Sequence, residues 1–165
     1  MMDQSLLSRC GIYCGACYVY RAERDCGSFI REVAKWQKVD IDKVKCNGCF
    51  APDEEKWPNC RKCSPWKCLE EKGLQFCYEC DQFWDYSCER YNSLEEFCAR
   101  RGENTRQNLI KIMADSERYL VEQDERWRCP SCGESYSWYE ENCHHCGKKL
   151  NRNDLSPLLF SHGID

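Results

Sequence analysis

The chain has 165 residues, with 24 Lys and Arg against 28 Asp and Glu, and its formal net charge at pH 7 is −4. This length fits one domain or two small ones, and the acidic balance argues against nucleic acid as a partner, because proteins that bind phosphate backbones carry a basic patch. Only 28 residues are Leu, Ile, Val or Phe, a smaller share than the roughly 20% expected of an ordinary globular core. We therefore expect bound metal to supply much of the folding free energy.

Cysteine is the residue in excess, with 17 copies. Two thiolates three residues apart on a tight turn bind one tetrahedral ion, and two such turns complete a Cys₄ site. The odd count and an N-terminus without an apolar stretch argue against a secreted, disulfide-bonded domain, so we expect a cytoplasmic protein. No run of about 18 apolar residues indicates a membrane span. Six Cys-x-x-Cys pairs are present: Cys14/Cys17, Cys46/Cys49, Cys60/Cys63, Cys77/Cys80, Cys129/Cys132 and Cys143/Cys146.

Residues 1–92 are expected to form an irregular cysteine-rich metal-binding module with short helices. Apolar residues recur at i, i+4 and i+7 within 28–38, which predicts an amphipathic helix that covers the metal-binding turns. A second short helix is predicted over 66–72, ended by Gly73 in the left-handed conformation. The apolar positions of the first helix are Phe29, Val33 and Trp36.

The order of cysteine motifs over 8–100 is typical of one family. The motifs are Cys10-Gly11-Ile12-Tyr13-Cys14-Gly15-Ala16-Cys17, Cys46-Asn47-Gly48-Cys49, Cys63, Cys68, Glu71-Lys72-Gly73-Leu74-Gln75-Phe76-Cys77-Tyr78-Glu79-Cys80 and Cys88. This set resembles the prokaryotic cysteine-rich family called domain of unknown function thirty-seven ninety-five. Such families commonly carry a proline before the last cysteine, where this chain has Ser87. The resemblance implies a metal-binding module and supplies no reaction.

Residues 93–126 are predicted to form a helical connector that packs on the module. Ser93 and Glu96 match a capping box, with Ser93 as the N-cap. A longer helix is predicted over 104–125, with charges opposite its apolar stripe. We expect the stripe to pack on the N-terminal module, and a partner helix is the alternative occupant. The stripe consists of Leu109, Ile112, Met113, Ser116, Tyr119, Leu120 and Gln123.

Residues 127–150 match a zinc ribbon, with two Cys-x-x-Cys knuckles separated by ten residues. Gly133 and Gly147 follow the knuckles and provide the positive φ that such turns require. Trp138 and Tyr139 are expected on the hairpin between the knuckles.

Two features near the C-terminus carry weaker predictions. His144 and His145 lie inside the second knuckle, and we interpret them as exposed turn residues rather than ligands. The tail of 151–165 contains Ser156-Pro157-Leu158-Leu159-Phe160. This segment matches a capped helical turn that docks back on the protein or recruits a partner.

The predicted fold is small α+β, metal-stabilised and cysteine-rich: an irregular multi-zinc module, a helical connector and a C-terminal zinc ribbon. Sequence proximity predicts about four zinc ions, which would bring the net charge to about −12, and ligation between distant pairs is the open alternative. Cys98 is left over and suits a small buried apolar position. The predicted ligand groups are Cys10, Cys14, Cys17 and Cys26; Cys46, Cys49, Cys60 and Cys63; Cys68, Cys77, Cys80 and Cys88; and Cys129, Cys132, Cys143 and Cys146.

Two functional interpretations remain open. In the first, the protein is a zinc-binding, non-catalytic interaction module with a protein partner, anchored by aromatic side chains that otherwise fill the core. In the second, it is an iron–sulfur or thiolate-based redox or metal-handling protein, with a cluster at the N-terminal sites. The sequence does not give the oligomeric state. The aromatic residues are Trp57, Trp66, Phe83, Trp84 and Tyr86.

Other functions are disfavoured. The spacing of Cys10, Cys14 and Cys17 is that of radical S-adenosylmethionine enzymes, but the chain is too short for their barrel and lacks βαβ alternation. Histidine occurs only near the C-terminus, and no phosphate loop or nucleophile elbow is present, so we expect no catalysis. RNA binding would require five basic residues to share one exposed face, namely Arg100, Arg101, Arg106, Lys111 and Arg118.

Overall fold

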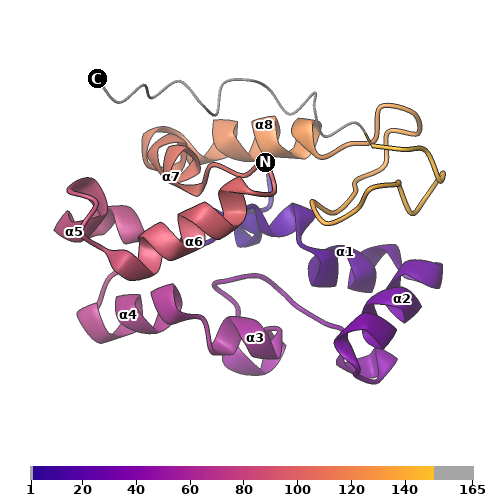
Figure 1. Cartoon of the computed structure of the whole chain (residues 1–165), viewed down its shortest axis with the longest axis horizontal. Helices are drawn as coiled ribbons and strands as arrows, with labels where there is room; N and C mark the ends of the chain where they lie inside the picture. The colour runs from indigo at the N-terminus through magenta and orange to yellow at the C-terminus, as the bar shows by residue number, and fades with distance from the viewer. Residues whose placement is uncertain (1, 151–165) are drawn as a thin grey trace.

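The computed structural model describes residues 2–150, and within them the protein is mostly helical (Figure 1). Five 3₁₀ turns connect or precede the helices: η1 Gln4–Leu6, η2 Cys14–Ala16, η3 Ile41–Lys43, η4 Asp53–Glu55 and η5 Cys77–Glu79. The α-helices are α1 Tyr18–Asp25, α2 Gly27–Gln37, α3 Pro58–Arg61, α4 Ser64–Lys72, α5 Asp81–Trp84, α6 Glu89–Ala99, α7 Thr105–Ala114 and α8 Ser116–Arg126.

The β-structure expected of an α+β fold is reduced, in the part of the chain described, to two isolated antiparallel bridges. One joins Arg128 to Ser135 and the other joins Asn142 to Lys149. Each bridge closes one knuckle of the C-terminal unit. Trp138 and Tyr139 lie in the turn between the knuckles rather than on a shared hairpin. The capped turn expected near Ser156 lies outside the described residues.

Two helices of the N-terminal module follow the sequence pattern. The helix predicted over 28–38 is α2, and its Phe29 and Val33 side chains are buried. Trp36 is 55% exposed and instead packs its ring against Tyr18, 4.9 Å away between centroids. The helix predicted over 66–72 is α4, and it ends at Gly73 with φ +67°.

The predicted helix N-cap at Ser93 is wrong. Ser93 lies inside α6, which begins after Cys88, and the N–H of Asn92 already donates to the Cys88 carbonyl oxygen at 2.9 Å. The capping-box pattern therefore falls within a helix whose first turn has formed four residues earlier.

The single helix predicted over 104–125 is also wrong, because the chain forms α7 and α8 with a break at Asp115. Asp115 adopts φ −161° and its carboxylate accepts from the N–H of Arg118, so it caps α8 as a new N-terminus. The stripe is buried as predicted at Leu109, Ile112, Tyr119, Leu120 and Gln123, whereas Met113 is 49% exposed.

The larger core draws on residues from Leu6 to Leu150 and surrounds the backbone of Cys10 and Gly11. Tyr91 donates its hydroxyl to the Cys10 carbonyl oxygen at 3.1 Å, and Asn108 donates to the Gly11 carbonyl oxygen at 2.9 Å. Helices α6 and α7 therefore both donate side-chain hydrogen bonds to the backbone of the first cysteine motif.

A smaller core lies between α1 and α2 and holds Val19, Val33, Val44 and Trp57. The C-terminal unit of residues 127–150, called the ribbon below for its two knuckles, continues from α8 and lies beside these two helices (Figure 1). Helices α3 and α4 lie along the edge opposite α8. Among the helices of the described residues, none is both long and apolar enough to cross a membrane.

Candidate metal centre

The four ribbon cysteines form the tightest group of potential ligands. Their sulfur atoms all lie within 4.8 Å of one another. The Cys129 and Cys146 sulfurs are 3.8 Å apart, and the Cys132 and Cys143 sulfurs are 3.7 Å apart. With Zn–S bonds of about 2.3 Å, the edge of a tetrahedral ZnS₄ site is about 3.8 Å, whereas a disulfide requires about 2.05 Å. The group therefore has the dimensions of a mononuclear tetrahedral site.

The two knuckles build this site by the same backbone pattern. The N–H of Gly133 donates to the Cys129 carbonyl oxygen at 2.8 Å, and the N–H of Gly147 donates to the Cys143 carbonyl oxygen at 2.7 Å. Both glycines have positive φ, +76° and +72°, as predicted. This geometry turns each pair of thiols toward the other pair.

The surroundings of the ribbon thiols favour ionisation of one of them first. Burial opposes ionisation of Cys129, but the N–H groups of Cys132 and Ser131 and two neighbouring thiols outweigh it and lower the pKa of Cys129 to about 7. Burial raises the pKa of Cys143 to about 12. A divalent cation would replace these protons, because the thiolate is the metal-binding form.

A second group of cysteines lines a small cavity between α4, η5 and α6. The cavity has a volume of about 20 Å³, and Cys68, Cys77, Cys80 and Cys88 all line it. Burial raises the pKa of Cys77 to about 12, and the other three thiols and Cys63 add to the effect. Lys72 donates from Nζ to the Cys80 sulfur at 3.3 Å. The structure thus brings together the four residues that sequence proximity groups.

Among the remaining N-terminal thiols, members of different predicted ligand groups lie close together. Burial raises the pKa of Cys10, and the thiols of Cys49 and Cys63 raise it further. Burial also raises the pKa of Cys14, which has Cys49, Cys17 and Cys46 as thiol neighbours. The thiols of Cys10 and Cys14 therefore lie near thiols of the second and third Cys-x-x-Cys pairs.

Cys46 and Cys60 form a coupled pair within this region. Cys60 donates its thiol hydrogen to Cys46, which lowers the pKa of Cys46 to about 6 and raises that of Cys60. The N–H groups of Trp57 and Gly48 also stabilise the Cys46 thiolate. One thiolate is therefore already favoured here before any cation binds.

Cys26 and Cys98 lie apart from these groups. Cys26 is exposed, and its thiol donates to the Glu23 carbonyl oxygen at 3.2 Å. Cys98 is fully buried in the larger core, the environment expected for a small apolar residue.

The structure also brings together a cluster that contains no thiol and that sequence reasoning missed. Asp25, His144 and His145 each offer a ligand atom within 4.8 Å of the others. His144 is not an exposed turn residue: its side chain is 10% exposed and its ring stacks on Phe29 with 4.1 Å between centroids. The pair of adjacent histidines was the one available signal, because Asp25 is 119 positions away from His144 in sequence.

Two carboxylates surround the His144 ring. Nε2 lies 3.1 Å from Asp25 Oδ2, and Nδ1 lies 2.8 Å from Glu140 Oε1. Burial opposes protonation of the ring, but the two carboxylates outweigh it and raise the pKa of His144 to about 9. In the metal-free chain the imidazole is therefore held between two negative charges.

The aromatic and basic residues considered as contacts for a partner differ in how far they are exposed. Trp57, Trp66 and Phe83 are buried, whereas Trp84 and Tyr86 are 47% and 59% exposed. The basic residues considered for RNA contact do not share an exposed face, because the Arg106 side chain is 8% exposed and ion-paired with Glu95 at 2.9 Å.

Comparisons with known proteins place the chain by family alone. The searches of the curated proteins and of the solved structures returned no match. The family model described as Protein of unknown function (DUF3795) matches residues 6–93, which is more than half of the chain and ends before the ribbon. The matched span contains all twelve cysteines from Cys10 to Cys88. The chain therefore belongs to the family Protein of unknown function (DUF3795).

Proposed function

We propose that this chain is a zinc-binding protein in which about four ions, held by thiolates, stabilise a non-catalytic interaction module. The observation that carries the proposal is the ribbon tetrahedron, with sulfur–sulfur distances of 3.7 and 3.8 Å at two opposite edges. Closed Cys₄ sites of this size are structural zinc sites, whereas catalytic zinc keeps a position open for water. In a cubane iron–sulfur cluster each thiolate binds a different iron, which holds the sulfurs farther apart.

The second proposed ion lies in the cavity lined by Cys68, Cys77, Cys80 and Cys88. The cavity is small, and apart from the thiols and the side chains of Lys72 and Arg90 its walls are apolar. Lys72 Nζ at Cys80 would offset part of the negative charge of a Cys₄ site.

Two further ions are proposed for the seven N-terminal thiols. One ion would take Cys10, Cys49 and Cys63, and the other would take Cys17, Cys46 and Cys60. Cys14 has thiol neighbours in both sets, namely Cys49 in the first and Cys17 and Cys46 in the second. We therefore assign Cys14 as a thiolate that bridges the two ions. This assignment replaces Cys26, whose thiol has a backbone partner instead.

Elemental analysis of the anaerobically purified chain, together with its absorption spectrum, tests the proposal. We expect a colourless protein with about four zinc atoms, which loses its helical circular-dichroism signal on exhaustive chelation and recovers it when zinc is returned. A brown protein with iron and acid-labile sulfide would favour the redox interpretation instead. A metal-free protein that keeps its helices would exclude both.

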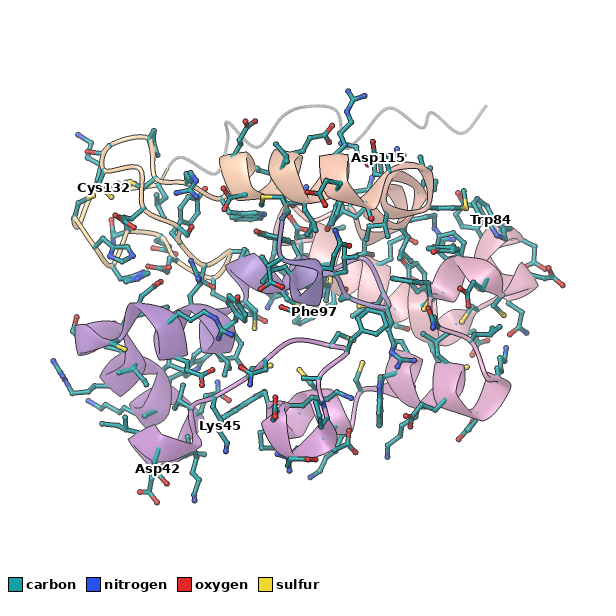
Figure 2. All side chains as sticks on the ribbon, turned by 180° about the vertical axis from the view of Figure 1, so that it is seen from behind. Asp42, Lys45, Trp84, Phe97, Asp115 and Cys132 are labelled. Carbon is teal, nitrogen blue, oxygen red and sulfur yellow. The ribbon has the colours of Figure 1, made fainter. Side chains whose placement is uncertain are left out.

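The interaction role is supported by the exposed aromatic residues at α5. Trp84 and Cys132 mark opposite ends of the molecule (Figure 2), so an aromatic surface there is free of the ribbon. Arg106 lies 4.1 Å from the centre of the Tyr86 ring and holds it in place. Exposed aromatics of this kind anchor protein partners. A Trp84→Ala, Tyr86→Ala double variant should keep its full zinc content and lose partner binding; unchanged binding would remove this surface from the proposal.

A further inference from the structure

The cluster of Asp25, His144 and His145 joins two separate parts of the protein. Asp25 is the last residue of α1, and the histidines lie in the second ribbon knuckle, which packs beside α1 and α2 (Figure 1). Asp25 Oδ2 lies 3.1 Å from His144 Nε2 and 3.6 Å from His145 Nε2. The three ligand atoms therefore converge on one point from two elements.

These distances are close to the spacing of ligand atoms around one metal ion. With metal–nitrogen and metal–oxygen bonds of about 2.0–2.1 Å, the ligand atoms of a tetrahedral site lie about 3.3–3.4 Å apart. The two observed distances lie on either side of this value, so a cation needs only small side-chain shifts to bind all three atoms. Arg21 Nε, 3.8 Å from Asp25 Oδ2, is the neighbouring cation that competes for the carboxylate.

Glu140 orients the His144 ring for this role. Its Oε1 lies 2.8 Å from His144 Nδ1 and accepts from the His144 backbone N–H at 3.0 Å, while its Oε2 accepts from the N–H of Ser137 at 2.6 Å. A carboxylate that binds the far nitrogen of a metal-binding imidazole fixes its tautomer and raises its basicity. Glu140 therefore directs Nε2 of His144 toward Asp25 and His145.

The donor set differs from that of the thiolate sites. Two imidazoles and one carboxylate bind zinc and other borderline divalent cations and leave a coordination position open. The side chains of Asp25 and His144 are 12% and 10% exposed, whereas that of His145 is 27% exposed. His145 therefore provides the entry side, from which solvent reaches the ion.

We propose that Asp25, His144 and His145 form an open, exchangeable site for a borderline divalent cation such as Zn²⁺, with Glu140 as its positioning residue. The free position takes water or an exchangeable small ligand. A cation there would also clamp the ribbon to the end of α1. The proposal uses none of the thiolates of the proposed function, and zinc content measured beside Co²⁺ uptake distinguishes failure of one from failure of the other.

Cobalt titration of the intact zinc-loaded chain tests the site. The protein is first dialysed against a mild chelator, which strips an open site faster than a closed Cys₄ site, and Co²⁺ is then added. We expect one further Co²⁺ per chain, with a ligand-field spectrum that lacks the thiolate-to-cobalt charge-transfer bands of a Cys₄ site. Shifts in the imidazole ¹⁵N resonances of His144 and His145 should follow the same binding curve.

Three variants decide the assignment. His145→Ala and Asp25→Asn should each weaken Co²⁺ binding by more than about 100-fold, and Glu140→Gln by about 10–100-fold, the range for residues that only orient a ligand. Asp42→Asn is the matched control, because Asp42 is a 70% exposed carboxylate paired with Lys43, and it should bind Co²⁺ as the parent chain does. Zinc content is measured for each variant, and His145→Ala counts only with its ribbon zinc retained; otherwise Asp25→Asn decides. The proposal is overturned if the parent chain takes up no Co²⁺, or if His145→Ala and Asp25→Asn both bind Co²⁺ as tightly as the parent chain does.

Discussion

The backbone N–H of Trp138 donates a hydrogen bond of 3.2 Å to the carbonyl oxygen of Ala16. Ala16 lies between Cys14 and Cys17, and Trp138 lies between the two ribbon knuckles. The bond therefore joins the turn of the first Cys-x-x-Cys pair to the segment between the two ribbon knuckles. The Trp138 side chain is buried at this contact, 6% exposed.

Trp138→Ala should lower the free energy of unfolding by about 3–5 kcal/mol, the range for large-to-small changes at buried aromatic positions. The ribbon should keep its zinc, because its four cysteines remain. Urea unfolding and elemental analysis check the two expectations. Trp84→Ala is the control: its ring is 47% exposed and its Nε1 donates to the Tyr78 carbonyl oxygen, so we expect a loss of about 1 kcal/mol. Equal losses of stability for both variants would contradict the role of Trp138 at the contact between the module and the ribbon.

Cys146→Ser should remove one zinc ion per chain, because a serine hydroxyl does not replace the fourth thiolate of the ribbon site. Cys98→Ala should leave the zinc content unchanged and cost about 1–2 kcal/mol, because it only removes a buried sulfur atom from the core. Metal analysis after gel filtration separates the two results. A loss of zinc from the Cys98 variant would show that this residue is a ligand.

Gly11→Ala should destabilise the protein far more than Gly27→Ala. Both glycines have positive φ, +89° and +63°, but an added Cβ at Gly11 would lie 2.2 Å from the Thr105 carbonyl oxygen, whereas at Gly27 nothing lies within 4 Å. The Gly27 variant should lose about 1–2 kcal/mol from its backbone alone. The Gly11 variant must also push α7 away from Cys10. Thermal unfolding of the two variants side by side measures the difference, and similar melting temperatures would count against this close approach.

Glu103→Gln should change how stability depends on pH. Burial raises the pKa of Glu103, although Arg126 and Asn108 oppose the shift. The folded chain therefore holds this proton at pH values where the unfolded chain has lost it, and stability falls as pH rises from about 4.5 through the raised pKa. Glutamine has no proton to lose here. The free energy of unfolding of the variant should therefore rise relative to that of the parent chain as pH rises, by up to about 1.4 kcal/mol per pH unit.

The control for this prediction has the opposite sign. Hydrogen bonding from Lys111 lowers the pKa of Glu122, so ionised Glu122 stabilises the fold above its unfolded pKa and this contribution is lost on acidification. The stability of the Glu122→Gln variant should therefore decrease relative to that of the parent chain as pH rises through the acidic range. Urea midpoints measured from about pH 3 to 7 check both variants, because the Glu122 effect falls below its unfolded pKa and the Glu103 effect above it. Parallel curves would refute the assignment for Glu103.

The sequence predicted those features that depend on neighbours along the chain. The end of α4 at Gly73 and the positive φ of Gly133 and Gly147 follow from the need for a residue without Cβ at those turns. The burial of Leu109 and Tyr119 follows from helical periodicity. The break between α7 and α8 was missed because the apolar stripe continues across it, although Asp115 offered an N-cap signal.

Features that depend on distant residues could not be predicted from local pattern. The proximity of Cys10 to Cys49 and Cys63 depends on how the first motif packs against the segments that carry the second and third pairs. The proximity of Asp25 to His144 depends on how α1 and the ribbon pack together. The four cysteines grouped by sequence proximity at Cys68, Cys77, Cys80 and Cys88 do line one cavity, because they are near neighbours along the chain. Sequence proximity did not predict that Cys10 and Cys14 lie near thiols of the second and third Cys-x-x-Cys pairs.

The long reach of the contacts around Cys10 and Gly11 sets an order of events during synthesis. Gly11 accepts hydrogen bonds from Asn108 and from Tyr119, and the N–H of Cys77 donates to the carbonyl oxygen of Arg9 at 3.0 Å. The beginning of the chain thus leaves the ribosome well before its partners exist. Until Tyr119 has emerged, the nascent chain presents its first thiols without the hydrogen bonds that enclose their backbone in the folded protein.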